Sequence, residues 1–131
     1  MARSDSMRLK LHTGEIGDAR RAWHEISLIR PDAVQHGIGL AQDSDILQSY
    51  SQMGIKTNVC PASNISLSLA DSYRSHPIRK MLSSGVKVTV ATDDLTVFGR
   101  SLSEEYLELY KAGVSVEELE KMRLNSIEAL S

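Results

Sequence analysis

Four side chains in this sequence combine metal-binding or acid–base chemistry with a position just after a short apolar stretch. They are His12, Glu15, His36 and Asp93. Zinc binds imidazole nitrogens and carboxylate oxygens, usually three or four from separate elements, and a catalytic zinc site keeps one position for water. His12 and Asp93 are therefore suitable ligands. Beside such an ion, a carboxylic acid can protonate a substrate atom and an imidazole can orient or deprotonate the water, which suits Glu15 and His36.

The segments that must position these residues alternate between strand and helix patterns. Short or alternating apolar runs predict the strands, and apolar residues spaced three and four apart predict the helices. We expect strands at 9–12, 33–34, 56–61 and 86–94, and helices at 18–29, 44–53, 77–83, 102–112 and 115–130. Such alternation is typical of parallel βα units. In a βα barrel the loops after the strands converge on one mouth, so the polar residues that follow the strands are expected to share one space.

Local signals place several helix ends. Asp18 is a suitable N-cap for the first helix, and Ser101 or Ser103 for the helix at 102–112. Ser115 and Glu118 have the spacing of a capping box, in which each side chain bonds the backbone of the other.

Composition excludes several classes of protein. The chain has 131 residues and a net charge of −2, with no basic run, so we expect one domain and no nucleic-acid partner. Cys60 is the only cysteine, which excludes an internal disulfide or a zinc site built from several thiolates and fits a reducing compartment. The sequence has neither a membrane-spanning apolar run nor a signal peptide, so we expect a cytoplasmic protein without a membrane partner.

Five short motifs follow one another along the chain. They are HTGE at 12–15, QHG at 35–37, CPASN at 60–64, HP at 76–77 and TDD at 92–94. In this order and spacing they resemble the carboxyl-terminal half of the adenosine deaminase family, which belongs to the metal-dependent amidohydrolases. The resemblance covers nearly the whole chain. It implies an α/β fold, a partial (β/α)8 TIM-type barrel of four βα units plus a C-terminal helix, as a single partial domain over residues 1–131.

The resemblance also implies an activity: hydrolytic deamination of adenosine or a related 6-aminopurine, with zinc as cofactor. His12 and Asp93 match zinc ligands. Glu15 matches the acid that protonates the purine ring at N1, and His36 the histidine beside the water that zinc activates. The expected partner is therefore a purine nucleoside or base.

Two further residues match substrate-binding positions of the family. Asp94 matches the residue that hydrogen-bonds the purine near N7. Gly14 matches the other substrate-binding position. Ser63 and Asn64 belong to a motif that is expected to support the site rather than react.

The sequence also departs from the family pattern. The amino-terminal half is absent, and with it the His-x-His pair that supplies two zinc ligands; no His-x-His occurs in this chain. His24 and His76 fall in predicted helix positions away from the strand ends and are poor replacements. Gln35 stands where glycine commonly precedes the histidine, and is expected to crowd the site. The sequence does not distinguish adenosine from adenine as the substrate, because residues that contact the ribose would lie mostly in the absent half.

Four parallel strands have two unpaired edges and, we expect, an apolar inner face that needs a cover. Association of two copies, or of swapped segments, through that face is therefore expected. A second interpretation also stays open: a non-catalytic half-barrel, a fragment or assembly module, that keeps the motif residues without a working metal site.

Overall fold

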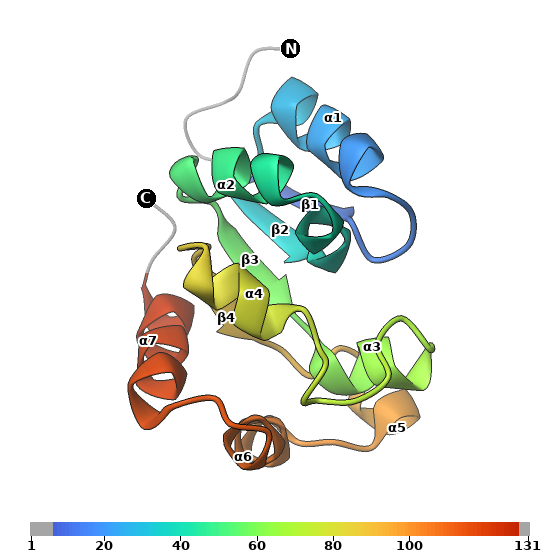
Figure 1. Ribbon diagram of the computed structural model, residues 1–131, viewed down its shortest axis with the longest axis vertical. Coiled ribbons are helices and arrows are strands. Elements are labelled where there is room, and N and C mark those ends of the chain that lie inside the picture. Colours follow the sequence, from blue (N-terminus) through green and yellow to red (C-terminus); the bar gives the residue numbers. More distant parts are fainter. Residues whose placement is uncertain (1–6, 129–131) are drawn as a thin grey trace.

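The computed structural model of the protein describes residues 7–128. Four strands form one parallel sheet in the order of the sequence (Figure 1). They are β1 (Lys10–Thr13), β2 (Ala33–His36), β3 (Lys56–Val59) and β4 (Val88–Val90). Each strand is followed by helical structure, so the prediction of an α/β fold built from four parallel βα units is confirmed.

The helices cover the rest of the chain. They are α1 (Ala19–Ile29), the 3₁₀ helix η1 (Ile38–Gln42), α2 (Ser44–Gln52), α3 (Pro61–Ser66), α4 (Ile78–Ser83), α5 (Leu95–Phe98), α6 (Leu102–Lys111) and α7 (Val116–Ile127). The short helices η1, α3 and α5 lie in segments that were expected to be loops or strand ends. The predicted continuation of the last helix to residue 130 lies outside the described residues.

The fourth strand is shorter than predicted. Val88 donates its backbone N–H to the Val86 carbonyl at 2.9 Å, which closes a tight turn directly before β4. After β4, Asp93 has a φ of 57°, in the left-handed region. The alternating valines therefore predicted the strand correctly but gave it too many residues. Turns at both ends shorten the strand.

The predicted caps are present. Asp18 accepts a hydrogen bond from the Arg21 N–H. Both hydrogen bonds of the Ser115–Glu118 capping box form at the start of α7. Ser101 rather than Ser103 caps α6, and Glu104 completes a second capping box there.

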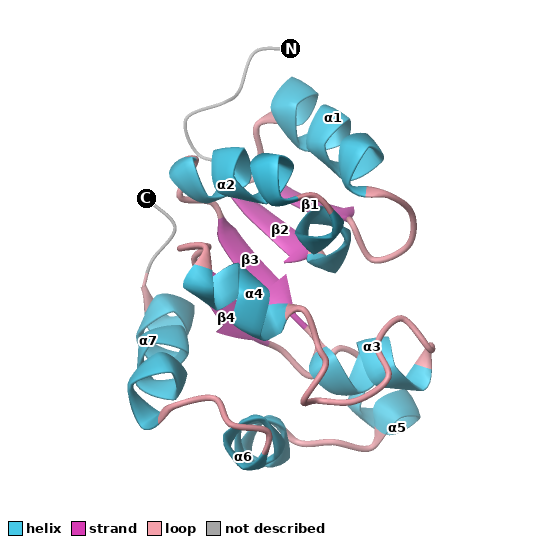
Figure 2. Ribbon diagram, in the orientation of Figure 1, coloured by secondary structure: helices cyan, strands magenta, loops and turns pink. Residues whose placement is uncertain are grey.

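One face of the sheet packs on helices and is apolar. Figure 2 shows α1, α2 and α4 over the strands, and Val34, Val59 and Val88 belong to the same buried core as residues of those helices. On this face Tyr50 of α2 hydrogen-bonds Thr57 of β3, with 2.5 Å between the two oxygens. Successive side chains of a strand point to opposite faces, so the residues between these belong to the other face.

That other face is polar, and the expectation of an apolar inner face was wrong. His12, Gln35, Asn58 and Thr89 occupy neighbouring register positions across the four strands. The Asn58 amide donates to Gln35 Oε1 at 3.3 Å, and the Thr89 hydroxyl donates to Asn58 Oδ1 at 2.5 Å. We call Gln35, Asn58 and Thr89 the polar ladder. Hydrogen bonds across three strands satisfy these side chains, so this face does not depend on apolar cover.

The exposed apolar side chains lie mainly in the first and last parts of the chain. Of the exposed large apolar side chains among the described residues, five precede β2, eight follow β4, and only Met53 and Leu67 lie between. β1 and β4 are also the edge strands, each paired on one side only within residues 7–128. No helix in that part of the chain is long and apolar enough to cross a membrane.

Candidate active site

His12 and Glu15 leave the carboxyl end of β1 through a turn that requires glycine. Gly14 has a φ of 70°, and a Cβ there would lie 2.9 Å from the Cα of Gly37. The Gly14 carbonyl accepts the Gly39 N–H at 2.7 Å, which ties this turn to the loop after β2. The close backbone contact brings the two loops together and sets the position of Glu15 beside them.

His36 ends β2 in a strained conformation. Its φ is 71°, a region that non-glycine residues enter mainly at turns and functional sites. Strand alternation gives His36 the phase of Val34, toward the helices, yet its ring lies against that of His12, with centroids 4.6 Å apart. The imidazole is 1% exposed, and its Nδ1 has no hydrogen-bond partner among the described residues.

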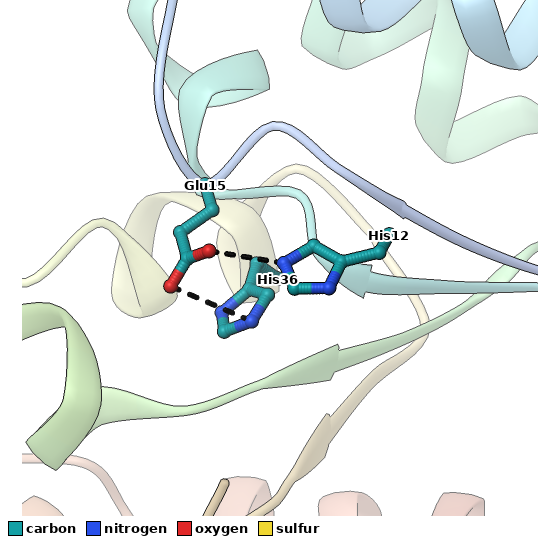
Figure 3. A group of neighbouring side chains, drawn as sticks. All are labelled: His12, Glu15 and His36. Carbon is teal, nitrogen blue, oxygen red and sulfur yellow. Dashed lines mark hydrogen bonds and ion pairs between the residues drawn. The ribbon is translucent and has the colours of Figure 1, made fainter.

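Glu15 connects the two imidazoles. Its Oε2 lies 3.0 Å from His12 Nε2, and its Oε1 lies 3.6 Å from His36 Nε2 (Figure 3). His12 is 63% exposed and Glu15 17% exposed. A carboxyl group between one exposed and one buried imidazole is suited to receiving and passing on protons.

Asp93 reaches the same place from β4. Its Oδ2 lies 3.9 Å from His36 Nε2 and accepts a hydrogen bond from the Ser63 hydroxyl at 2.8 Å. Asp94, its neighbour, accepts the Val97 N–H and caps α5. The structure thus brings His12, Glu15, His36 and Asp93 into one group and leaves Asp94 on the exposed rim.

The surroundings of His36 determine its charge. Burial lowers the pKa of His36, the nearby Glu15 and Asp93 carboxylates act in the opposite direction, and His12 lowers it further. The net direction is down, so His36 is a neutral imidazole at neutral pH and can accept a proton.

The donors present fit zinc chemically. The ligand atoms of His12, Glu15 and His36 lie within 4.8 Å of one another, and those of His36, Cys60 and Asp93 form a second such group. Imidazole and carboxylate donors are those that zinc accepts. Cys60 is a poor ligand, because burial, followed by the nearby Asp93 charge, raises the pKa of its thiol to about 12. The unpartnered Nδ1 of His36 is a further donor without an internal use.

Two hollows meet at Glu15. One is a cleft of about 760 Å³ that also contacts Gly39, Arg74 and His76, and the other is a cavity of about 310 Å³ beside His12 and Glu25. Volumes of this size are typical of sites for small organic molecules.

Gln35 does not crowd the reacting group. Its side chain donates to the Cys60 thiol at 3.1 Å and accepts from Asn58, so it lies along the polar ladder. His76 is engaged elsewhere: its Nε2 lies 3.0 Å from Asn64 Oδ1, and its Nδ1 accepts the Ile78 N–H. His24 is exposed on α1. His24 and His76 thus lie outside the group formed by His12, Glu15, His36 and Asp93, although His76 lines the larger hollow.

Sequence reasoning missed Glu105. Glu105 lies in the first turn of α6, is 0% exposed and accepts a hydrogen bond from the backbone of α3. Only the helical phase of Glu105, one residue from the capping Glu104 and four before the buried Leu109, signals that it faces inward.

Comparisons with known proteins agree with this geometry. A family model described as adenosine deaminase matches residues 1–130. The chain is 35% identical over 130 residues to an adenine deaminase of Rhizobium rhizogenes, covering 98% of this chain and 40% of that protein. It superposes on the crystal structure of an adenine deaminase from Arthrobacter aurescens with a TM-score of 0.85 and 31% identity, covering 92% of this chain and 37% of the other.

A second solved structure is an amidohydrolase from Burkholderia ambifaria with bound zinc, at a TM-score of 0.81 and 27% identity, covering 92% of this chain and 35% of that one. The chain therefore spans about two fifths of the length of such relatives, as a partial barrel. With the family model matched over almost every residue, the chain belongs to the adenosine deaminase family of aminohydrolases.

Proposed function

We propose that residues 1–131 are the carboxyl-terminal part of a zinc-dependent hydrolytic deaminase that removes the 6-amino group of an aminopurine. One observation carries the proposal: residues from three separate strand ends, His12 with Glu15, His36 and Asp93, converge on one group. That arrangement unites metal donors, an acid and a neutral base, which is the set that hydrolytic deamination requires.

His12 and Asp93 are the residues that would hold zinc, with further ligands supplied from outside this chain. When bound, zinc lowers the pKa of a coordinated water from about 15.7 towards 7 and so makes a nucleophile available at neutral pH. The donor chemistry of the two residues supports this assignment, and the Ser63 hydroxyl would help to hold the Asp93 carboxylate in place.

Glu15 holds the proton that goes to N1 of the purine ring, which makes C6 electrophilic. His36, buried and neutral, orients the attacking water and accepts its proton. Asp94 on the rim hydrogen-bonds the purine near N7. Gly14 lacks a side chain at the point where the two loops touch, and so allows the turn that places Glu15 beside the substrate.

Adenine is the first substrate to test, because the relatives described above are named adenine deaminases. Adenosine is the second. A reducing, cytoplasmic location is part of the proposal and is supported by the single, buried and free Cys60.

The test is reconstitution. The chain is co-expressed with the portion of the Arthrobacter aurescens enzyme that it does not match, and ammonia release from adenine is measured with zinc present. Turnover that disappears in the Asp93→Asn variant supports the proposal. A folded, zinc-loaded complex that converts neither adenine nor adenosine overturns it.

The second candidate is a non-catalytic half-barrel module. The observation that favours it is the absence of His-x-His, which leaves the chain two of the family's zinc ligands short. Metal analysis of the purified chain separates the two: about one equivalent of zinc supports the enzyme, and metal-free protein that gives no turnover after reconstitution supports the module.

We also propose that the ends of the sheet, rather than its inner face, contact the rest of the barrel or a second copy of the chain. The polar ladder satisfies the inner face, whereas the exposed apolar residues cluster before β2 and after β4. Sedimentation of the purified chain tests this proposal. A strictly monomeric chain would exclude contact with a second copy.

A further inference from the structure

Glu105 is a buried carboxylate with no part in the chemistry proposed above. It lies on α6 and is 0% exposed. Its Oε1 accepts the Ala62 N–H of α3 at 3.0 Å, and its Oε2 accepts the Tyr73 hydroxyl at 3.0 Å. Figure 1 shows α3, α5 and α6 beyond the carboxyl ends of the strands. A fully buried carboxyl group with both oxygens engaged holds its partners in a narrow range of positions.

What Glu105 holds is the helix that carries Ser63. α3 is only six residues long, and Ala62 lies in its first turn. Ser63, the next residue, is 0% exposed and donates its hydroxyl to Asp93 Oδ2 at 2.8 Å. Two hydrogen bonds on adjacent residues therefore link α6 to α3 and α3 to Asp93.

Asp93 needs such support. Its φ of 57° places it in the left-handed region, which is unfavourable for a residue with a side chain. The carboxylate is 33% exposed, so packing alone does not fix it. Carboxylates that bind metals are usually oriented by further hydrogen bonds, and loss of such a partner typically costs about 10- to 100-fold in metal affinity or activity.

We propose that Glu105 and Ser63 are positioning residues for Asp93: Glu105 fixes α3, and Ser63 on α3 orients the Asp93 carboxylate toward the reacting group. The hydrogen bonds of Glu105 and Ser63 do not depend on the proposed function. Their contribution to catalysis rests on the proposed function of Asp93.

Amide hydrogen exchange of the metal-free chain tests the proposal directly. Ser63→Ala is expected to accelerate exchange at 93–99 about threefold to tenfold, because one hydrogen bond that orders this segment is lost. Glu105→Leu is expected to accelerate exchange at both 62–67 and 93–99. Amides of the core residues Leu109 and Met122 keep their wild-type rates.

Matched variants separate positioning from general stability. Glu105→Gln is expected to restore wild-type rates at both segments, because its amide oxygen accepts from Ala62 and its NH₂ donates to the Tyr73 oxygen. Glu104→Leu, the same change on the exposed neighbour, is the control and leaves 93–99 unaffected. Should Glu105→Leu fail to fold, Tyr73→Phe removes one of the two donors and predicts a smaller acceleration in the same segments.

Zinc affinity of the reconstituted complex, which supplies the further ligands, is the second readout and is measured by competition with a chromophoric chelator. Ser63→Ala is expected to weaken binding about 10-fold or more, and Ser66→Ala on the exposed side of α3 to leave it unchanged. Unchanged exchange at 93–99 in Ser63→Ala overturns the proposal, and so does a uniform acceleration that includes Leu109. Since exchange is measured without metal or substrate, failure of the deaminase function would leave this result interpretable.

Discussion

His36 and His76 are two buried imidazoles in very different surroundings. They are 1% and 2% exposed. Both nitrogens of His76 are engaged, by Asn64 and by the Ile78 N–H. His36 has one nitrogen without a partner, two carboxylates near the other, and a left-handed φ.

The difference teaches how to separate structural from functional polar groups in this fold. A buried polar group that contributes only to stability has its hydrogen bonds satisfied within the protein. A group reserved for a substrate or an ion retains unsatisfied atoms and strain, which the surrounding structure must tolerate. On this criterion His76 is a structural group, whereas His36 is a candidate for function; Asn64 Nδ2 is a second buried atom without a hydrogen-bond partner among the described residues.

The largest expected effect is on the chemistry. Glu15→Gln preserves size but cannot donate the proton assigned to it, so the reconstituted enzyme is expected to lose about 100- to 10,000-fold in kcat. The unfolding free energy of the chain should change by less than about 1 kcal/mol, since the Gln amide has the same size and can still hydrogen-bond His12. Retained kcat in this variant would contradict the distinction between the two regions.

The next effect is on stability, where we expect His76 to matter more than His36, whereas His36 matters more for turnover. His76→Leu leaves Asn64 Oδ1 and the Ile78 N–H unsatisfied in the interior, at a cost of about 3–5 kcal/mol in unfolding free energy. His36→Leu removes a group with an unpartnered nitrogen and is expected to cost less than about 1 kcal/mol while abolishing turnover. Urea denaturation measures both, and equal losses of stability would break the comparison.

Acid should reveal the burial of His76 as a loss of stability. Burial lowers the pKa of His76 from 6.5 to about 4. Above pH 6.5 both folded and unfolded states are neutral and the stabilisation is fully present. As pH falls from 6.5 to 4 the unfolded state takes up a proton that the native state resists, so up to about 3 kcal/mol is lost. His76→Gln cannot titrate and should show correspondingly less loss over this range, with His36 present in both proteins. Identical pH profiles would mean that His76 does not titrate as described.

The smallest effect is expected for the exposed His24, which serves as the control for the two buried histidines. His24 is exposed on α1, so His24→Ala is expected to change the unfolding free energy by less than about 0.5 kcal/mol and to leave kcat unchanged. Thermal unfolding and the ammonia assay check both. A larger effect would show that an exposed histidine of this chain has a role that neither buried one reveals.

Local signals made much of the fold predictable. Asp18 and the Ser115–Glu118 pair cap their helices because capping depends on residues three positions apart in the sequence. Strand order followed from the βα alternation. The inner face was not predictable from the short strands, because Gln35 and Asn58 acquire their partners only when three strands align.

The closeness of the four candidate residues was predictable, and their detailed geometry was not. Motifs identified His12, Glu15, His36 and Asp93, but the left-handed backbone of His36 depends on contacts between loops that the sequence does not specify. Glu104 and Glu105 are neighbours of the same residue type; helical phase turns Glu105 inward, but its partner, the Ala62 N–H of α3, is known only from the structure.

The polar ladder has a consequence for the behaviour of this chain when it is separated from any partner. Stacking of sheets into insoluble material requires apolar faces, and edge-to-edge growth requires long exposed strands. Here the bare face is polar, β4 is three residues long, and the Asn125 side chain donates to the Val88 carbonyl. The polar face and the short β4 edge of this sheet therefore disfavour both routes of aggregation.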